Sequence, residues 1–254
     1  MYEKYYKQFV DNFNLLSQRY DKYRIFLDFL KLASYSMYNV FRKSEEIESK
    51  YLNIVKTYRK DELEIFCKMF GELTLMYEYK NEIVDILGEF YMQNKIGNNS
   101  LGQFFTPFHI AEFMGKINCG TKEQMEKIID KNGYITLSEP CCGAGAMILG
   151  FVKALKDEDI NYQQNLLVYA VDISEICAYM TYVQLSLYGI PAIVFCGDSI
   201  TQKMNFQLET PFYFMNYWKF RKVNNKTEDI SSNEKIITKF NEVTVKGNCQ
   251  FSLW

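Results

Sequence analysis

The sequence predicts a doubly wound α/β domain with a mainly parallel sheet, preceded by a helical domain. From residue 102 to residue 199, short strand-like apolar runs alternate with helix-like segments, which is the pattern of successive βαβ units with right-handed crossovers. Before residue 92, apolar residues recur every three or four positions, which is helical spacing. We therefore expect a helical domain at 1–96, an α/β domain at 97–220 and a C-terminal extension at 221–254.

Three helices are expected in the N-terminal part. Two apolar stripes mark the first two helices, and they consist of Phe26, Phe29, Leu30, Ala33, Met37, Val40 and Phe41, and of Leu63, Phe66, Cys67, Phe70, Leu73 and Met76. The third helix is expected to begin near Asn81, a good N-cap residue, and to end at the polar stretch 97–100.

The α/β part has a helix-initiating signal and then alternating elements. Thr106 stands before Pro107, so a helix is expected to begin there, with Thr106 as N-cap and Pro107 in the first turn. Strands are expected at 134–138, 166–171 and 192–196, and helices at 146–155 and 174–187. After residue 199 the pattern weakens: 210–218 is strongly aromatic, 219–235 is polar and loop-like, and 236–245 fits either a last strand or a short helix.

Composition excludes several classes of protein. The seven cysteines include no CxxC pair, and His109 is the single histidine, so no zinc-ligand pattern is present and reduced thiols are expected. No apolar run approaches the roughly 20 residues that span a bilayer, and the N-terminus lacks the apolar core of a signal peptide. We expect a soluble, cytoplasmic protein. Its net charge of −2 provides no overall attraction to nucleic acid, so contact with DNA would need a local basic patch or a partner subunit.

The run Glu139-Pro-Cys-Cys-Gly-Ala-Gly-Ala-Met147 lies between a predicted strand and a predicted helix. Gly143 and Gly145 would allow a sharp turn and a close approach of the backbone to a ligand at the helix N-terminus. This arrangement is typical of a nucleotide-type cofactor loop, although small βα turns also occur for packing alone. The adjacent Cys141 and Cys142 are too close for an unstrained disulfide and are interpreted as small loop residues.

Two aspartates follow the next two predicted strands. Asp172 comes 27 positions after Gly145, near the spacing at which an acidic residue holds a ribose hydroxyl in dinucleotide-binding folds. It could also cap the next helix, and both roles could coexist. Asp198 could accept a hydrogen bond from the amine of a bound adenine, or it could be a turn aspartate.

Together these motifs resemble those of adenine-specific DNA methyltransferases. Gly102-Gln-Phe-Phe-Thr-Pro107, Glu139 to Gly145, Ala170-Val-Asp-Ile173 and Gly197-Asp-Ser199 follow the order of the S-adenosylmethionine (SAM) motifs in the modification subunits of type I restriction systems and their phage- or plasmid-borne relatives. The resemblance covers roughly residues 81 to 213. It implies a Rossmann-like methyltransferase domain that transfers the methyl group of SAM to the exocyclic amine of adenine in DNA, with a partner specificity subunit.

The resemblance also implies roles for individual residues. Phe104, Thr106 and Pro107 would line the methionine end of SAM, with Thr106 near the carboxylate. Glu139, Cys141, Gly143 and the second loop glycine, Gly145, would cradle the amino-acid portion. Asp172, followed by Ile173 in the same motif, would hold the ribose, and Asp198 would meet the adenine.

The sequence departs from the family at the catalytic motif. The family uses Asn/Asp-Pro-Pro-Tyr/Phe, whereas the nearest match here is Glu209-Thr-Pro-Phe212, which lacks the asparagine. Glu209 and Pro211 are the catalytic candidates by position, and Phe212 or Tyr213 could stack on an extruded base. The alternative is an aromatic core segment. A catalytically degenerate SAM-binding protein, recruited to replication or restriction machinery, is therefore the competing function.

Two features concern the C-terminal part. Only 42 residues follow Phe212, too few for the remaining strands of a complete methyltransferase sheet and a target-recognition domain, so sequence specificity is expected to come from elsewhere. Gln250-Phe-Ser-Leu-Trp254 resembles the short tail by which bacterial DNA-processing proteins bind the replicative sliding clamp. The alternative is a C-terminal strand that packs on the parent domain.

Overall fold

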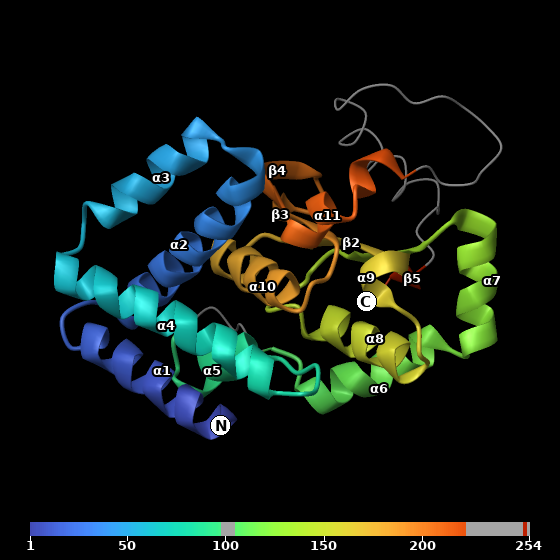
Figure 1. The fold of residues 1–254 in the computed structure, drawn as a ribbon, viewed down its shortest axis with the longest axis horizontal. Coiled ribbons are helices and arrows are strands. Elements are labelled where there is room, and N and C mark those ends of the chain that lie inside the picture. The colour runs from blue at the N-terminus through green and yellow to red at the C-terminus, as the bar shows by residue number, and fades with distance from the viewer. Residues whose placement is uncertain (98–104, 222–250, 253–254) are drawn as a thin grey trace.

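The computed structural model describes residues 1–97, 105–221 and 251–252 (Figure 1). Five helices form the N-terminal part, drawn in blue to green: α1 (Tyr2–Ser17), α2 (Lys22–Arg42), α3 (Glu45–Val55), α4 (Lys60–Tyr79) and α5 (Ile86–Gln93). None of the described helices is both long enough and apolar enough to cross a membrane.

A five-stranded sheet with the order β4-β3-β2-β1-β5 follows. Its strands are β1 (Ile135–Glu139), β2 (Leu166–Asp172), β3 (Ala192–Asp198), β4 (Lys203–Glu209) and β5 (Phe251–Ser252). The helices of this part are α6 (Phe108–Cys119), α7 (Lys122–Asn132), α8 (Ala146–Asp157), α9 (Tyr162–Asn165), α10 (Glu175–Leu187), α11 (Pro211–Met215) and a 3-10 helix, Trp218–Phe220. β5, β1, β2 and β3 pair in parallel, and β4 is antiparallel to β3. The predicted α/β fold with a mainly parallel sheet and preceding helices is confirmed.

Apolar sequence explains both the strands and the central helix. β2 and β3 are buried along almost their whole length, as expected for strands covered on both faces. Helix α10 is buried at every position from Ile176 to Ser186, because it lies between the sheet and the N-terminal helices. One continuous apolar core joins the N-terminal helices to one face of the sheet.

Helix α2 packs against α10 (Figure 1). Lys31 forms an ion pair with Glu175 at 3.0 Å, and one turn later the Tyr35 hydroxyl hydrogen-bonds to the Tyr179 hydroxyl at 2.7 Å. Partners four residues apart on each helix thus advance together. This register docks the N-terminal helices on the α/β part.

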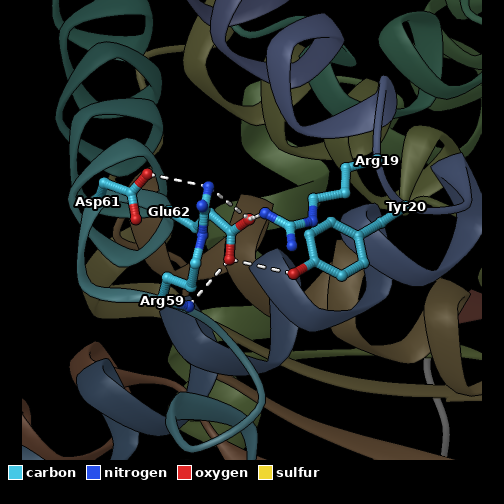
Figure 2. Close-up of polar contacts among 5 residues, drawn as sticks. All are labelled: Arg19, Tyr20, Arg59, Asp61 and Glu62. Carbon is cyan, nitrogen blue, oxygen red and sulfur yellow. Dashed lines mark hydrogen bonds and ion pairs between the residues drawn. The ribbon is translucent and has the colours of Figure 1, made fainter.

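A buried carboxylate fixes the start of α4 within the N-terminal helices (Figure 2). The Glu62 carboxylate accepts hydrogen bonds from the Arg59 backbone N–H at 2.9 Å and from the Tyr20 hydroxyl at 3.0 Å, and it forms an ion pair with Arg19 at 3.3 Å. Arg59 also pairs with Asp61. The backbone hydrogen bond, followed by these partners, lowers the pKa of Glu62. The α1–α2 corner is thereby tied to the first turn of α4.

The elements differ from the sequence prediction in several places, and helices α1, α3 and α7 were not expected. The third helix begins at Ile86 with Asp85 as its N-cap, so the expected start near Asn81 is wrong. Helix α6 begins at Phe108 with Pro107 in the N-cap position, one residue later than expected. β4 was not expected, because its sequence Lys-Met-Asn-Phe-Gln-Leu-Glu is polar at alternate positions. The undecided element at 236–245 lies outside the described residues.

Helices α6 and α8 approach each other at two glycines. A Cβ on Gly115 would lie 2.3 Å from the Gly150 backbone, and a Cβ on Gly150 would lie 2.2 Å from the Ala111 carbonyl oxygen. Real Cβ atoms do not tolerate such contacts, and the obstructing atoms belong to backbone, which has little freedom to shift. The close packing of α6 on α8 therefore requires both glycines.

We predict that Gly150→Ala destabilises the protein by about 1–3 kcal/mol, because the added methyl group forces the two helices apart. Gly71→Ala is the matched control: Gly71 is exposed within α4 and nothing lies within 4 Å of an added Cβ. This control should gain up to about 1 kcal/mol from helix propensity. Urea unfolding followed by circular dichroism measures both. Unfolding free energy in Gly150→Ala equal to that of the wild type would contradict the packing argument.

Candidate functional site

The carboxyl ends of β1, β2 and β3 lie at one edge of the sheet. Glu139 ends β1, Asp172 ends β2 and Asp198 ends β3, and the parallel registers place these strand ends side by side. Loops and helix N-termini converge at this edge, which is where open α/β sheets bind ligands. The structure thus brings together the three strand-end motifs that the sequence singled out.

The loop between β1 and α8 is held in one conformation by its own backbone and by β2. Cys142 N–H donates to the Val171 carbonyl at 2.9 Å, and Gly145 N–H donates to the Cys142 carbonyl at 2.7 Å. Gly143 has φ +56° and Gly145 has φ +96°, in the left-handed region that favours glycine. Gly145 is the N-cap of α8, so the free amides of that helix face the same edge.

Asp172 connects this loop to the one that follows β2. One carboxylate oxygen accepts a hydrogen bond from Gly143 N–H at 2.8 Å, and the other accepts from Ser174 N–H, also at 2.8 Å. Ser174 is the N-cap of α10, so the alternative that Asp172 caps this helix is wrong; Asp172 instead accepts from the backbone N–H of the N-cap residue. Burial raises the pKa of Asp172 despite these two hydrogen bonds.

Glu139 is a buried carboxylate with one oxygen left over. Its side chain is 3% exposed, and Oε1 accepts from Cys141 N–H at 3.2 Å. Oε2 is buried and has no hydrogen-bond partner among the described residues. Burial, with a smaller contribution from the nearby Asp172, raises the pKa of Glu139 to about 7. A cation placed against Oε2 would offset the cost of burying this charge.

Two side chains of α10 hold the loop from behind. The Thr181 hydroxyl donates to the Gly143 carbonyl at 2.9 Å, and the Gln184 amide nitrogen donates to the Ala144 carbonyl at 2.8 Å. The sequence interpretation missed both residues. The sequence shows only that each is a polar residue in a largely apolar helix, and buried polar side chains usually have a hydrogen-bond partner. It does not show which residues those partners are.

The residues before α6 lie beside the loop. Phe104 is outside the described residues, and Thr106 and Pro107 are exposed at the start of the helix. The Phe105 ring lies 3.3 Å from where a Cβ on Gly143 would stand, so the ring packs on the loop. Phe105, Thr106 and Pro107 also line a pocket of about 620 Å³. Its other lining residues include Glu82, Asp85, Glu89 and His109, with further residues of α5, α6 and α8.

Ile173 and Asp198 lie at the outer part of the same edge. Ile173 is 73% exposed, and Ile200, two residues after Asp198, is 92% exposed. The Asp198 carboxylate accepts from the backbone N–H groups of Ile200 and Thr201, at 2.8 and 3.2 Å, which is the turn arrangement of the alternative. Hydrogen bonds from Thr201 and Ile200 lower its pKa. Cys141 is exposed and Cys142 is buried.

The four predicted catalytic residues lie at the opposite end of the sheet. Because β4 runs antiparallel to β3, Glu209 pairs with Ile193 near the start of β3, whereas Lys203 pairs with Asp198 at its end. Five residues along a strand correspond to about 16 Å. Pro211, Phe212 and Tyr213 follow Glu209 in α11. The structure does not bring these residues to the cofactor loop, contrary to what their interpretation as catalytic candidates requires.

Residues 209–213 make contacts with α2 and with a separate apolar cluster. The Glu209 carboxylate forms a 2.6 Å ion pair with Arg42, and its other oxygen has no hydrogen-bond partner among the described residues. Tyr213 is 5% exposed and packs in a cluster with Tyr134 and Trp218. The Phe212 ring lies 3.0 Å from where a Cβ on Gly189 would stand. These contacts correspond to the aromatic core alternative.

The described part of the C-terminal tail is a strand. Phe251 and Ser252 pair in parallel with Leu137 and Ser138 of β1, as the packing alternative for this tail expected. Residues 250, 253 and 254 of the proposed clamp-binding motif lie outside the described residues. Nothing in the comparisons below points to a sliding clamp.

Two solved structures resemble this fold at low similarity. One is the methyltransferase subunit of a type I restriction-modification system from Streptococcus thermophilus, with 13% identity and a TM-score of 0.38, covering 75% of this chain and 57% of that chain. The other is a Listeria monocytogenes protein assigned to the class I S-adenosylmethionine-dependent methyltransferases, with 13% identity and a TM-score of 0.33, covering 71% of this chain and 55% of that one. This chain thus spans somewhat more than half the length of each.

The sequence comparisons are more specific. No curated protein matches the chain significantly. The family described as N-6 DNA methylase matches residues 76–252, which include the whole sheet, the loop from Glu139 to Gly145, and Asp172 and Asp198. Because this match covers more than half of the sequence, the chain belongs to the N-6 DNA methylase family.

Proposed function

We propose that this protein binds SAM at the carboxyl edge of its sheet and transfers the methyl group to the exocyclic amine of adenine in DNA. The observation that carries the proposal is the buried Glu139 carboxylate, whose Oε2 has no hydrogen-bond partner among the described residues. SAM carries an α-ammonium group, which would supply the positive charge and the N–H donor that this oxygen has no partner for. Membership of the N-6 DNA methylase family supports the same cofactor and the same target atom.

The other residues at this edge fit SAM as well. Gly143 and Gly145 let the backbone lie close to a ligand, and the N-terminus of α8 offers free amides. Each oxygen of Asp172 already accepts one backbone hydrogen bond, and a carboxylate oxygen has a second lone pair with which to accept from a ribose hydroxyl. Ile173 and Ile200 present exposed apolar surface on either side of Asp198, where an adenine ring would lie.

In this proposal the protein contributes to catalysis by positioning SAM and by the electrostatic field of its charged residues. SAM supplies an electrophilic methyl group on its sulfonium. Glu139 and the loop to Gly145 fix the amino-acid end, and Asp172 fixes the ribose, so that the methyl group faces an incoming amine in line.

The substrate and the partner rest on family membership and charge. The net charge of −2 provides no general attraction to a polyanion, so we propose that a specificity subunit supplies DNA contact and target choice.

A second candidate function is favoured by the position of residues 209–213. A SAM-binding protein that has lost methyl transfer would keep the loop edge intact and would be free to use the former catalytic segment for packing. Glu209 is paired with Arg42, and Tyr213 is buried, at the far end of the sheet from the loop. In this alternative the protein acts through binding to restriction or replication machinery.

We predict that SAM affinity increases about twentyfold between pH 5.5 and 7.5, because Glu139, with a pKa of about 7, must lose its proton to pair with the ammonium group. This range stays below the pKa of an α-amino group, roughly 7.7–8.0. Glu139→Gln should bind more weakly, with little dependence on pH. Isothermal titration calorimetry measures both proteins. Wild-type protein that does not bind SAM would rule out both candidate functions.

A second prediction concerns stability without ligand. The folded-state pKa of Glu139 is raised from 4.5 to about 7, so the folded protein holds a proton that the unfolded chain has already lost in this range. Stability from this group is present at pH 4.5 and is lost as the pH rises through 7, to a total of about 3 kcal/mol. Glu139→Gln should match the wild type at pH 4.5 and exceed it at pH 8 in urea unfolding. Equal pH profiles for the two proteins would show that Glu139 titrates normally.

The third prediction separates the two functions. With tritium-labelled SAM methyl groups and unmethylated DNA, the wild-type protein should label adenine when a specificity subunit is present, whereas Asp172→Ala should fail to do so because it binds SAM poorly. Digestion of the DNA and chromatography of the nucleosides identifies the labelled base. If SAM binds but no nucleic acid is labelled, with or without a partner, the methyltransferase function is ruled out and only the binding function remains.

A further inference from the structure

Gln184 is fully buried in the middle of α10 and uses its whole side-chain amide. The nitrogen donates to Asp85 Oδ1 at 2.7 Å and to the Ala144 carbonyl at 2.8 Å. The oxygen accepts from the Tyr77 hydroxyl at 2.7 Å and from Leu87 N–H at 3.2 Å. Tyr77 belongs to α4, Asp85 caps α5 and Leu87 lies in its first turn, whereas Ala144 lies in the cofactor loop.

We propose that Gln184 is a positioning residue that couples the N-terminal helices to the cofactor loop, so that SAM affinity depends on its hydrogen bond to Ala144. This inference rests on the proposed function, because it assumes that the loop binds SAM. It assigns α4 and α5 a role in cofactor binding that acts through Gln184.

The loop geometry gives this hydrogen bond its importance. Ala144 is 1% exposed and stands between two glycines with positive φ, the residues with the most conformational freedom. Its carbonyl is held by Gln184, just as the Gly143 carbonyl is held by Thr181. Without the Gln184 donor, a buried carbonyl loses its partner and the peptide between Ala144 and Gly145 is released to rotate. The Gly143 N–H that Asp172 binds belongs to the same short turn.

Tyr188, the C-cap residue of the same helix, offers a matched control. Its hydroxyl accepts from Val84 N–H and donates to the Val84 carbonyl, both at 2.9 Å, so it also ties α10 to the segment before α5. It makes no contact with the loop among the hydrogen bonds of the described residues. Tyr188→Phe therefore loosens the attachment of the N-terminal helices without touching Ala144.

A charge-conserving exchange separates the two contacts of the Gln184 amide nitrogen. In the double variant Asp85→Asn with Gln184→Glu, an amide on α5 faces a carboxylate on α10, so this contact keeps one donor and one acceptor. The introduced carboxylate can still accept from Tyr77 and Leu87. It cannot donate to Ala144, so the loop contact is lost. The exchange also weakens the cap of α5, because the Asp85 Oδ1 that accepts from Gln184 accepts from Gly88 N–H as well, at 2.8 Å.

The test measures SAM affinity by calorimetry and unfolding free energy by urea on the full chain for the wild type, Gln184→Met, Tyr188→Phe and the double variant. We expect Gln184→Met and the double variant to bind SAM about tenfold more weakly, because each leaves the Ala144 carbonyl without a donor. Tyr188→Phe should lose stability and keep its SAM affinity within about twofold. Amide hydrogen exchange should accelerate at Ala144 and Gly145 in the two Gln184 variants and stay unchanged in Tyr188→Phe.

Wild-type affinity for SAM in the folded double variant or in Gln184→Met would overturn this inference and leave the proposed function standing. An equal loss of affinity in Tyr188→Phe would also overturn it, because the effect would then follow general loosening of the helices. If Gln184→Met does not fold, the double variant decides. A wild-type protein that binds no SAM would instead remove the proposed function, and this inference with it.

Discussion

Helix α10 is buried on every face, and this constraint organises the rest of the molecule. Polar side chains on a helix without a solvent-facing side need partners inside the protein. On α10 the Ser186 hydroxyl has no hydrogen-bond partner among the described residues, whereas other polar side chains of this helix are paired. Tyr179 is paired with Tyr35 of α2, Thr181 with the Gly143 carbonyl, and Gln184 with partners in α4, α5 and the cofactor loop. The same helix therefore holds the N-terminal helices on one side and the loop on the other. A shift of α10 would therefore move the cofactor loop through Thr181 and Gln184.

The candidate site stores an electrostatic cost that a ligand can relieve. Glu139 and Asp172 are two carboxylates at adjacent strand ends, and burial raises the pKa of both. Asp172 is stabilised by two backbone hydrogen bonds, whereas one oxygen of Glu139 has no partner among the described residues. Proteins retain such local conflicts mainly where function requires them. The arrangement favours a cationic ligand over a neutral one of the same shape.

The sequence was sufficient to predict the strands that are buried on both faces. The apolar runs of β1, β2 and β3 predict buried parallel strands, and the glycine loop and strand-end aspartates follow from that topology. β4 could not be predicted in the same way, because its alternating polar residues reflect an edge strand with one exposed face. Its antiparallel direction carries Glu209 to the far end of the sheet, which no local pattern reveals.

Tertiary contacts explain the remaining differences. Asn81 has good capping chemistry, but Asp85 is the N-cap of α5, because its carboxylate also accepts the Gln184 amide from α10. Gln184 itself was passed over, since a single polar residue in an apolar helix shows its importance only when its four partners are known. Both cases concern contacts between residues about 100 positions apart in the chain.

Carboxyl-carbon NMR of glutamate-labelled protein reports directly on the pairing of Glu139 with a cationic ligand. The Glu139 resonance, assigned by its absence in Glu139→Gln, should titrate with a pKa of about 7 in the free protein. Saturating SAM should shift this pKa below that of an ordinary glutamate, about 4.3, because the ammonium group stabilises the ionised form. A Glu139 pKa that SAM leaves unchanged would contradict the account.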